Sequence, residues 1–265
     1  MDAAPLPDAA TLPVGGDLQL AVLGCDGSYA GPGGASSGYL VRSATTSLWL
    51  DTGPGTLGRL QRHLPLRELS AVVVSHEHPD HCGELPVVRN ALKYLLDIEG
   101  LPVLTTRGTR ALVDHISGGA APTFAWDVVA DGAERQVGDL RLRFARTDHP
   151  VETVAVRVDH PAGSVAYSSD TGGRFDASAL DPDGTGVDLF VVEATMPPDL
   201  EDQAQHLSAR QAAAAAIACG ARRVLVTHVA PGDDPGRRRA EVEAELREAG
   251  SEATVLAAAD HQTRG

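Results

Sequence analysis

The sequence predicts a single-domain α/β fold, and three observations predict it. Strand-type segments separated by Gly and Ser fill the first part of the chain, whereas strands and helices alternate in its last third. The length of 265 residues suits one large domain with two sheets and covering helices. No linker-like segment divides the chain.

Residues 1–16 contain acids, prolines and alanines but no basic start and no apolar centre. We therefore expect a flexible tail there, not a secretory signal, and a folded domain over residues 17–265. A helix is expected over residues 83–98, where Pro86 fits only in the first turn. The first strands are expected at residues 18–23, 39–41, 48–50 and 71–75.

The second half of the chain begins with strands and ends with helices. Ser208 and Gln211 have the spacing of a capping box, which predicts a polyalanine helix that ends before Gly220. A last helix is expected over residues 238–249. The strands are expected near residue 103 and at residues 126–129, 140–144, 154–158, 165–167, 187–192 and 223–227.

A cluster of possible metal ligands follows the apolar run at residues 71–75. It reads His76-Glu77-His78-Pro79-Asp80-His81 and is expected on the loop at the carboxyl end of that strand. Imidazole and carboxylate suit zinc and similar divalent ions. Alternate residues of an extended loop (His76 and His78) can converge on one ion, while Asp80 and His81 can hold a second.

Three more possible ligands follow likely strands later in the chain. His149 comes after residues 140–144, Asp170 after residues 165–167, and His228 after residues 223–227. Binding sites gather at strand ends in layered α and β folds. Together with the cluster at residues 76–81, these positions predict one dinuclear metal site.

This pattern resembles that of the metallo-β-lactamase superfamily, whose sequence order is His-x-His-x-Asp-His, a lone His, an Asp and a final His. The resemblance covers residues 18 to about 256 and implies a four-layer αββα sandwich. It also implies two divalent ions, with Zn²⁺ the first choice and Mn²⁺ or Fe²⁺ as alternatives. One ion is assigned to His76, His78 and His149, the other to Asp80, His81 and His228, and Asp170 bridges both. Asp51 matches an early aspartate and is expected to orient a ligand without binding the metal.

Two further segments resemble the ribonuclease Z branch of the superfamily. They are Glu193-Ala194-Thr195 and His206-Leu207-Ser208, in which a Glu and a His act together beside the metals. The opening Leu23-Gly24-Cys25 and the later Ser37-Gly38-Tyr39-Leu40 are more similar to atypical class II cyclic-nucleotide phosphodiesterases of actinobacteria. The resemblance thus implies hydrolysis of a small phosphodiester such as a 3′,5′-cyclic nucleotide.

The expected reaction uses a hydroxide that bridges the two ions. Asp80 is expected to orient this hydroxide, and His206, oriented by Glu193, to protonate the leaving alkoxide. Ser36 and Ser37 on the glycine-rich loop are expected to contact the phosphate of the substrate.

The formal net charge of −14 disfavours a large polyanionic partner, because proteins that bind nucleic acid use clustered Lys and Arg. We expect a small anionic substrate. No run of eighteen apolar residues exists, so no membrane association is expected. Three scattered cysteines favour a cytoplasmic location over a disulfide framework. The resemblance also implies a homodimer.

Three alternatives remain at this stage. A ribonuclease Z-like nuclease is disfavoured by the charge and by the short segment between His149 and Asp170, which leaves no room for a substrate-binding arm. A thioester or lactone hydrolase would use the same metal core but has less need of an acid such as His206. A binding protein without activity would be expected to lack one of the seven ligands.

Overall fold

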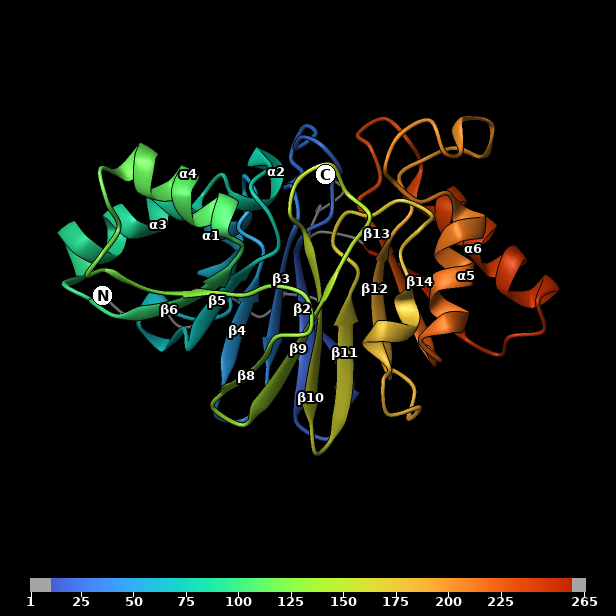
Figure 1. Ribbon diagram of the computed structural model, residues 1–265, viewed down its shortest axis with the longest axis horizontal. Coiled ribbons are helices and arrows are strands. Elements are labelled where there is room, and N and C mark those ends of the chain that lie inside the picture. Colours follow the sequence, from blue (N-terminus) through green and yellow to red (C-terminus); the bar gives the residue numbers. More distant parts are fainter. Residues whose placement is uncertain (1–10, 259–265) are drawn as a thin grey trace.

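The computed structural model describes residues 11–258 as two seven-stranded sheets packed face to face, with helices on both outer sides (Figure 1). Helices α1, α3 and α4 cover the first sheet, and α5 and α6 cover the second. This is the predicted four-layer αββα arrangement in one domain. Among the described residues no helix is long and apolar enough to cross a membrane.

The first sheet contains strands β1 to β7 in sequence order. Strands β1 to β4 pair antiparallel, and β4 to β7 pair parallel. The strands are β1 Thr11–Gly15, β2 Leu18–Gly24, β3 Gly38–Arg42, β4 Ser47–Leu50, β5 Ala71–Val74, β6 Leu101–Thr105 and β7 Phe124–Val128. The helices between them are α1 Thr56–Leu60, α2 Pro79–Cys82, α3 Leu85–Ala91 and α4 Arg107–Ser117.

The second sheet repeats this arrangement with the order reversed, β14 to β8. Strands β8 to β11 pair antiparallel, and β11 to β14 pair parallel. The strands are β8 Glu134–Val137, β9 Leu140–Arg146, β10 Val154–His160, β11 Gly163–Tyr167, β12 Leu189–Glu193, β13 Arg223–Thr227 and β14 Thr254–Ala257. The helices are α5 Ala209–Ala218 and α6 Pro235–Glu248.

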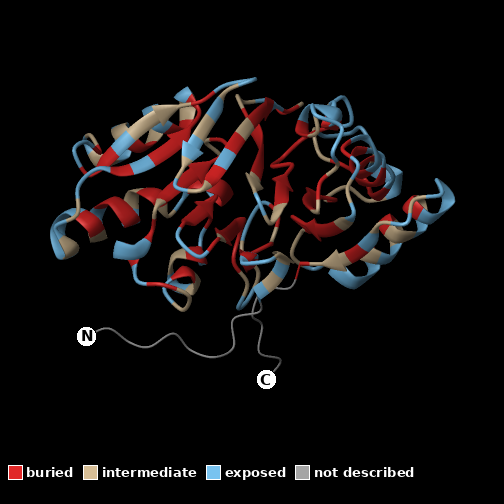
Figure 2. Cartoon of the chain, turned by 90° about the horizontal axis from the view of Figure 1, so that it is seen from below, coloured by how far each residue is buried: buried red, intermediate tan, exposed pale blue. Residues whose placement is uncertain are grey.

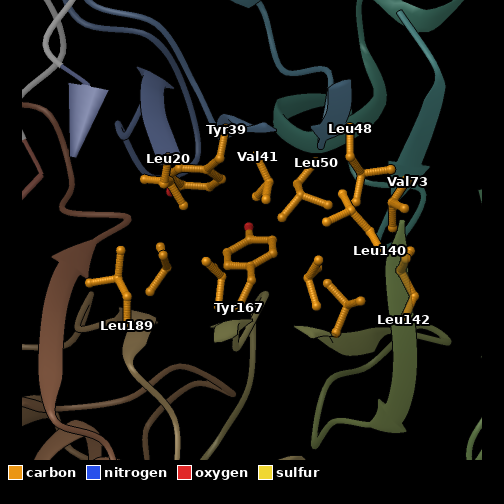
Figure 3. Packing of buried hydrophobic residues seen from close by; sticks show 14 of the residues in the cluster. Leu20, Tyr39, Val41, Leu48, Leu50, Val73, Leu140, Leu142, Tyr167 and Leu189 are labelled. Atoms are coloured by element: carbon orange, nitrogen blue, oxygen red, sulfur yellow. The ribbon is translucent and has the colours of Figure 1, made fainter. Parts of the chain in front are cut away.

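The central strands are buried on both faces, which explains their nearly continuous apolar sequences (Figure 2). In β12, Leu189 and Val191 face the other sheet, whereas Phe190 and Val192 face the helices. Between the sheets, the rings of Tyr39 and Tyr167 approach each other with centroids 5.0 Å apart (Figure 3). A central strand such as β12 therefore contributes to two of the three apolar layers.

Two predictions about the chain need correction. The predicted tail does not extend to residue 16, because β1 pairs antiparallel with β2 from Thr11 onwards. Residues 1–10 lie outside the described part. The helix predicted over residues 83–98 is present but shorter, from Leu85 to Leu96: after α3 it continues as a π-helical segment, Leu92–Leu96, which widens the last turns and ends at Asp97, whose φ is 53°. Pro86 does lie in the first turn of α3.

Candidate metal centre

The predicted site residues meet at one end of the two sheets. The seven possible ligands, Asp51 and Glu193 come at or soon after the end of a strand, so the pairing of the central strands sets their positions. His206 instead precedes α5, and Ser36 and Ser37 precede β3. Three of the strand ends turn sharply: Asp51, Ser169 and His228 have φ values of 55°, 53° and 56°. Positive φ is uncommon for residues with a side chain, and such positions cluster at functional sites.

The first cluster consists of His76, His78, His149 and Asp170. Nδ1 of His78 lies 3.1 Å from Nε2 of His76 and 3.1 Å from Nε2 of His149. Oδ2 of Asp170 lies 3.8 Å from Nε2 of His76 and 4.0 Å from Nε2 of His149. Four possible ligand atoms thus converge on one point.

The second cluster consists of Asp80, His81, Asp170 and His228. The Nε2 atoms of His81 and His228 lie 3.3 Å apart. Oδ2 of Asp80 lies 3.4 Å from His81 Nε2 and 3.3 Å from His228 Nε2. Oδ1 of Asp170 lies 3.2 Å and 3.3 Å from the same two nitrogens. Asp170 therefore offers one oxygen to each cluster.

These residues fit two divalent ions. Ligands at 2.0–2.1 Å from a tetrahedral zinc lie about 3.3 Å from one another, which is close to most of the observed spacings. Oδ1 of Asp170 is fully buried and lacks a hydrogen bond of good geometry, so it is an acceptor in need of a cation. Several ring nitrogens also face one another, an arrangement that imidazoles adopt when their lone pairs share an ion.

The directions in which the pKa values of the clustered residues shift agree with a site that binds cations. Burial would raise the pKa of Asp170, but the nearby His228 and His81 hold that pKa well below its usual range. Burial would lower the pKa of His81, yet the charges of Asp170 and Asp51 raise it. For His76 burial dominates and lowers the pKa, which favours the neutral ring that a metal ligand requires.

Asp51 lies behind the second cluster. Its Oδ2 atom accepts a hydrogen bond from His81 Nδ1 at 2.7 Å, on the side of the ring away from the other ligands. The hydroxyl of Tyr167 and the backbone N–H of Ser75 also donate to this carboxylate, at 2.9 and 2.7 Å. The contact with His81 is the one that the predicted orienting role requires. Tyr167 and Ser75 were missed because their sequence positions read as ordinary strand residues.

Glu193 and His206 form a pair beside the second cluster. Nδ1 of His206 lies 3.0 Å from Oε1 of Glu193, and its ring stacks on that of His228 with centroids 5.4 Å apart. Burial would lower the pKa of His206, but the charge of Glu193 outweighs it and raises this pKa to about 9. His206 is therefore a protonated imidazolium at neutral pH in the metal-free protein.

Ser36 and Ser37 do not fit their predicted role in this conformation. Both are completely buried, and neither hydroxyl has a hydrogen-bond partner among the described residues. They lie beneath the turn at Gly53, whose Cα position leaves no room for a side chain between Ser36, Ser37 and Asp80. A substrate phosphate cannot reach these hydroxyls. The glycine-rich loop instead contacts the site through the backbone N–H of Ser28, which donates to Asp80 Oδ2 at 3.0 Å.

A four-layer αββα fold with two His/Asp clusters at the strand ends defines a metal-dependent hydrolase. Residues 46–229 match the family described as the beta-lactamase superfamily domain, which is more than half of the chain. The protein therefore belongs to this superfamily, as the sequence motifs predicted.

Curated relatives support the same class. Uncharacterized protein Rv1339 of Mycobacterium tuberculosis is 34% identical over 232 residues, which cover 81% of each chain. The probable metallo-hydrolase YhfI of Bacillus subtilis is 26% identical over 215 residues, 80% of this chain and 87% of that protein. Ribonuclease Z of Mycobacterium avium is 28% identical over 245 residues, 81% of this chain and 86% of that protein.

Solved structures show the same fold. The crystal structure of YhfI superposes with a TM-score of 0.79 at 24% identity, covering 91% of this chain and 95% of that one. The short form of human tRNase Z gives a TM-score of 0.71 at 18% identity, covering 91% and 96%. The fold and the hydrolase class are thus established. The class of substrate has to be inferred from the residues of the site.

Proposed function

We propose that this hydrolase cleaves a small phosphodiester, and that a 3′,5′-cyclic nucleotide is the substrate to test first. The observation that carries the proposal is the pair of Glu193 and His206 beside the two clusters. A phosphodiester releases a strongly basic sugar alkoxide, so its cleavage gains from a positioned acid. His206 is the group placed to supply that proton.

The proposed ligands are the seven residues of the two clusters: His76, His78, Asp80, His81, His149, Asp170 and His228. Two divalent ions bound there would supply hydroxide at neutral pH and stabilise the charge that develops on the phosphate. The protein residues orient this chemistry. Asp51 fixes the ring of His81, and Ser28 N–H holds the carboxylate of Asp80.

Charge supports this choice of substrate. Four metal charges, less two ligand carboxylates and one hydroxide, leave a core near +1, which suits a mono-anionic diester. The ligand carboxylates are those of Asp80 and Asp170. The chain as a whole, with a formal net charge of −14, would repel a long polyanion but not a small one.

The segment between His149 and Asp170 supports a small substrate as well. It consists of β10 and β11, a hairpin in which His160 pairs with Gly163. This tight connection leaves no arm that could hold a folded RNA. Although one relative is named ribonuclease Z, the alternative of a nuclease therefore has less support here.

The first experiment is a comparison of substrates with the purified protein loaded with Zn²⁺ or Mn²⁺. Cyclic AMP, bis(p-nitrophenyl) phosphate, a thioester and a lactone should be assayed side by side. We expect metal-dependent release of AMP. Turnover of the thioester or lactone alone, with full metal occupancy, would reject the phosphodiesterase proposal and favour a carbonyl hydrolase of the same superfamily.

The acid role of His206 has a separate test. His206→Ala should slow cyclic AMP hydrolysis by about 10²–10⁴-fold, but it should slow bis(p-nitrophenyl) phosphate hydrolysis far less, because p-nitrophenolate leaves without a proton. His115→Ala is the control, since His115 is an exposed histidine of α4. Equal losses on both substrates would remove His206 from the acid role.

A further inference from the structure

Thr195 connects the second cluster with the Glu193–His206 pair. It is half-buried and lies two residues after the end of β12. Its Oγ1 atom lies 2.7 Å from Glu193 Oε2, 2.8 Å from His228 Nδ1 and 2.8 Å from the carbonyl oxygen of His228. Three polar atoms thus compete for one hydroxyl group.

The number of protons decides how these contacts are made. A hydroxyl has one proton to donate, and two of its three neighbours, Glu193 Oε2 and the His228 carbonyl, can only accept. A bond to an ionised carboxylate is the stronger of these two. If the proton goes to Glu193, the hydroxyl oxygen is left to accept the N–H of His228 Nδ1.

This direction leaves the lone pair of His228 on Nε2. That nitrogen lies 3.3 Å from Asp80 Oδ2 and 3.3 Å from Asp170 Oδ1, within the second cluster. The opposite direction, with the hydroxyl donating to Nδ1, would place a proton on Nε2 and prevent it from binding a metal. Only the first direction is compatible with the proposed ligand role of His228.

The other oxygen of Glu193 extends the chain of hydrogen bonds. Oε1 accepts from His206 Nδ1 at 3.0 Å and from the backbone N–H of Thr171 at 2.7 Å. Oε2 also accepts from the backbone N–H of Leu207 at 3.2 Å. Glu193 is completely buried, so these three donors, together with the hydroxyl of Thr195, hold its carboxylate in one orientation. Nδ1 of His206 is thereby committed to Glu193, and Nε2 is left to exchange a proton.

We propose that Thr195 is a positioning residue that sets the tautomer of the metal ligand His228 and, through Glu193, the orientation of the acid His206. The hydrogen bonds run from His228 Nδ1 to Thr195, from Thr195 to Glu193, and from His206 to the same carboxylate. The inference rests on the proposed metal site and deepens the proposed function. Metal binding and leaving-group protonation therefore depend on one hydroxyl group.

The test compares Thr195→Val, which keeps the shape but removes the hydroxyl, with Thr195→Ser, which keeps the hydroxyl. Thr46→Val is the control, because Thr46 is buried in the β3–β4 turn at the opposite end of the sheet. Zinc affinity is measured by competition with a chelator. We expect Thr195→Val to weaken zinc binding at the second cluster, which contains His228, by about 10–100-fold, the range found for residues that orient a ligand. Thr195→Ser and Thr46→Val should stay within about 3-fold of the wild type.

A second readout is the ratio of cyclic AMP hydrolysis to bis(p-nitrophenyl) phosphate hydrolysis. Thr195→Val should lower this ratio about 10-fold and Thr195→Ser should restore it, because the ratio depends on His206. Unchanged zinc affinity in Thr195→Val, or an equal loss in Thr195→Ser, would overturn the inference. If the protein hydrolyses neither diester, the proposed function fails, but the zinc measurement still decides the role of Thr195.

Nitrogen NMR of the zinc-loaded wild type provides a measurement that does not depend on the folding of any variant. In ¹⁵N-histidine-labelled protein, His228 should carry its proton on Nδ1. A proton on Nε2 of His228 would overturn the inference.

Discussion

The two clusters of candidate metal ligands contain similar side chains but differ in what surrounds them. In the first cluster, His76 Nδ1 lies 3.0 Å from the Ser75 hydroxyl and His149 Nδ1 lies 3.2 Å from the Gln205 carbonyl, both neutral groups. In the second cluster, His81 Nδ1 contacts the carboxylate of Asp51 at 2.7 Å. Partners that fix a ligand also raise its basicity, so the surroundings favour tighter metal binding in the second cluster.

The largest effect is expected from Asp170→Ala, which removes the residue common to both clusters. Loss of this carboxylate leaves three ligands for each ion and unbalances the charge, so both ions should bind more weakly and activity should fall by about 10³-fold. Metal content after dialysis, measured by mass spectrometry, provides the check. A variant that keeps two tightly bound ions would show that Asp170 does not bridge them.

The next effect concerns the His206–Glu193 pair in the metal-free protein. The pKa of His206 is about 9 in the folded state, above the ordinary value of about 6.5. The proton therefore stabilises the fold fully below about pH 6.5, and this stabilisation is lost as pH rises through about 9. The shift corresponds to about 3 kcal/mol.

We expect the difference in unfolding free energy between wild type and His206→Gln to shrink by roughly that amount, about 3 kcal/mol, between pH 6 and pH 10. Urea denaturation of both metal-free proteins across this range measures it. A difference that does not change with pH would contradict a protonated His206.

Asp51→Asn should affect the two clusters unequally. Asp51 contacts the ring of His81 directly, whereas it reaches His76 of the first cluster only through the hydroxyl of Ser75. The second cluster should therefore lose about 10–100-fold in zinc affinity, and the first should lose less. Chelator titration of the two zinc ions provides the measurement. Asp139→Asn is the control, because Asp139 accepts hydrogen bonds from Ser43 and Thr45 in the β3–β4 turn, far from both clusters. Equal weakening of both sites would show that the clusters bind as one unit.

The smallest effect is expected at Cys82, which follows the ligands of the second cluster. Burial raises the pKa of the Cys82 and Cys219 thiols to about 12, so only about 10⁻⁴ of each is ionised at pH 8. Neither should react with a thiol reagent before the protein unfolds. Cys82→Ala should keep zinc affinity and activity within about 3-fold of the wild type. A larger loss would show that the thiol takes part in metal binding or catalysis.

Local sequence patterns predicted the elements whose structure depends on neighbouring residues. The strand predicted at residues 223–227 is β13, and the capping box of Ser208 and Gln211 opens α5 with both of its hydrogen bonds. Helix α4 was not predicted, although Thr106 caps its start and Gly118 ends it with a φ of 64°. The helical period was present in the sequence but was overlooked, since the buried Thr109 and Val113 lie one turn apart among polar residues.

The sequence alone determined the ligand types, their order along the chain and the strand ends on which they lie. The tertiary structure decided which of them meet, because contacts such as His228 to Asp80 join residues 148 positions apart and depend on how two sheets pack. It also decided that Ser36 and Ser37 are buried beneath a turn and that Thr195 contacts two site residues at once. Hydrogen bonds of this kind depend on differences of a few tenths of an ångström in position, which residue spacing does not encode.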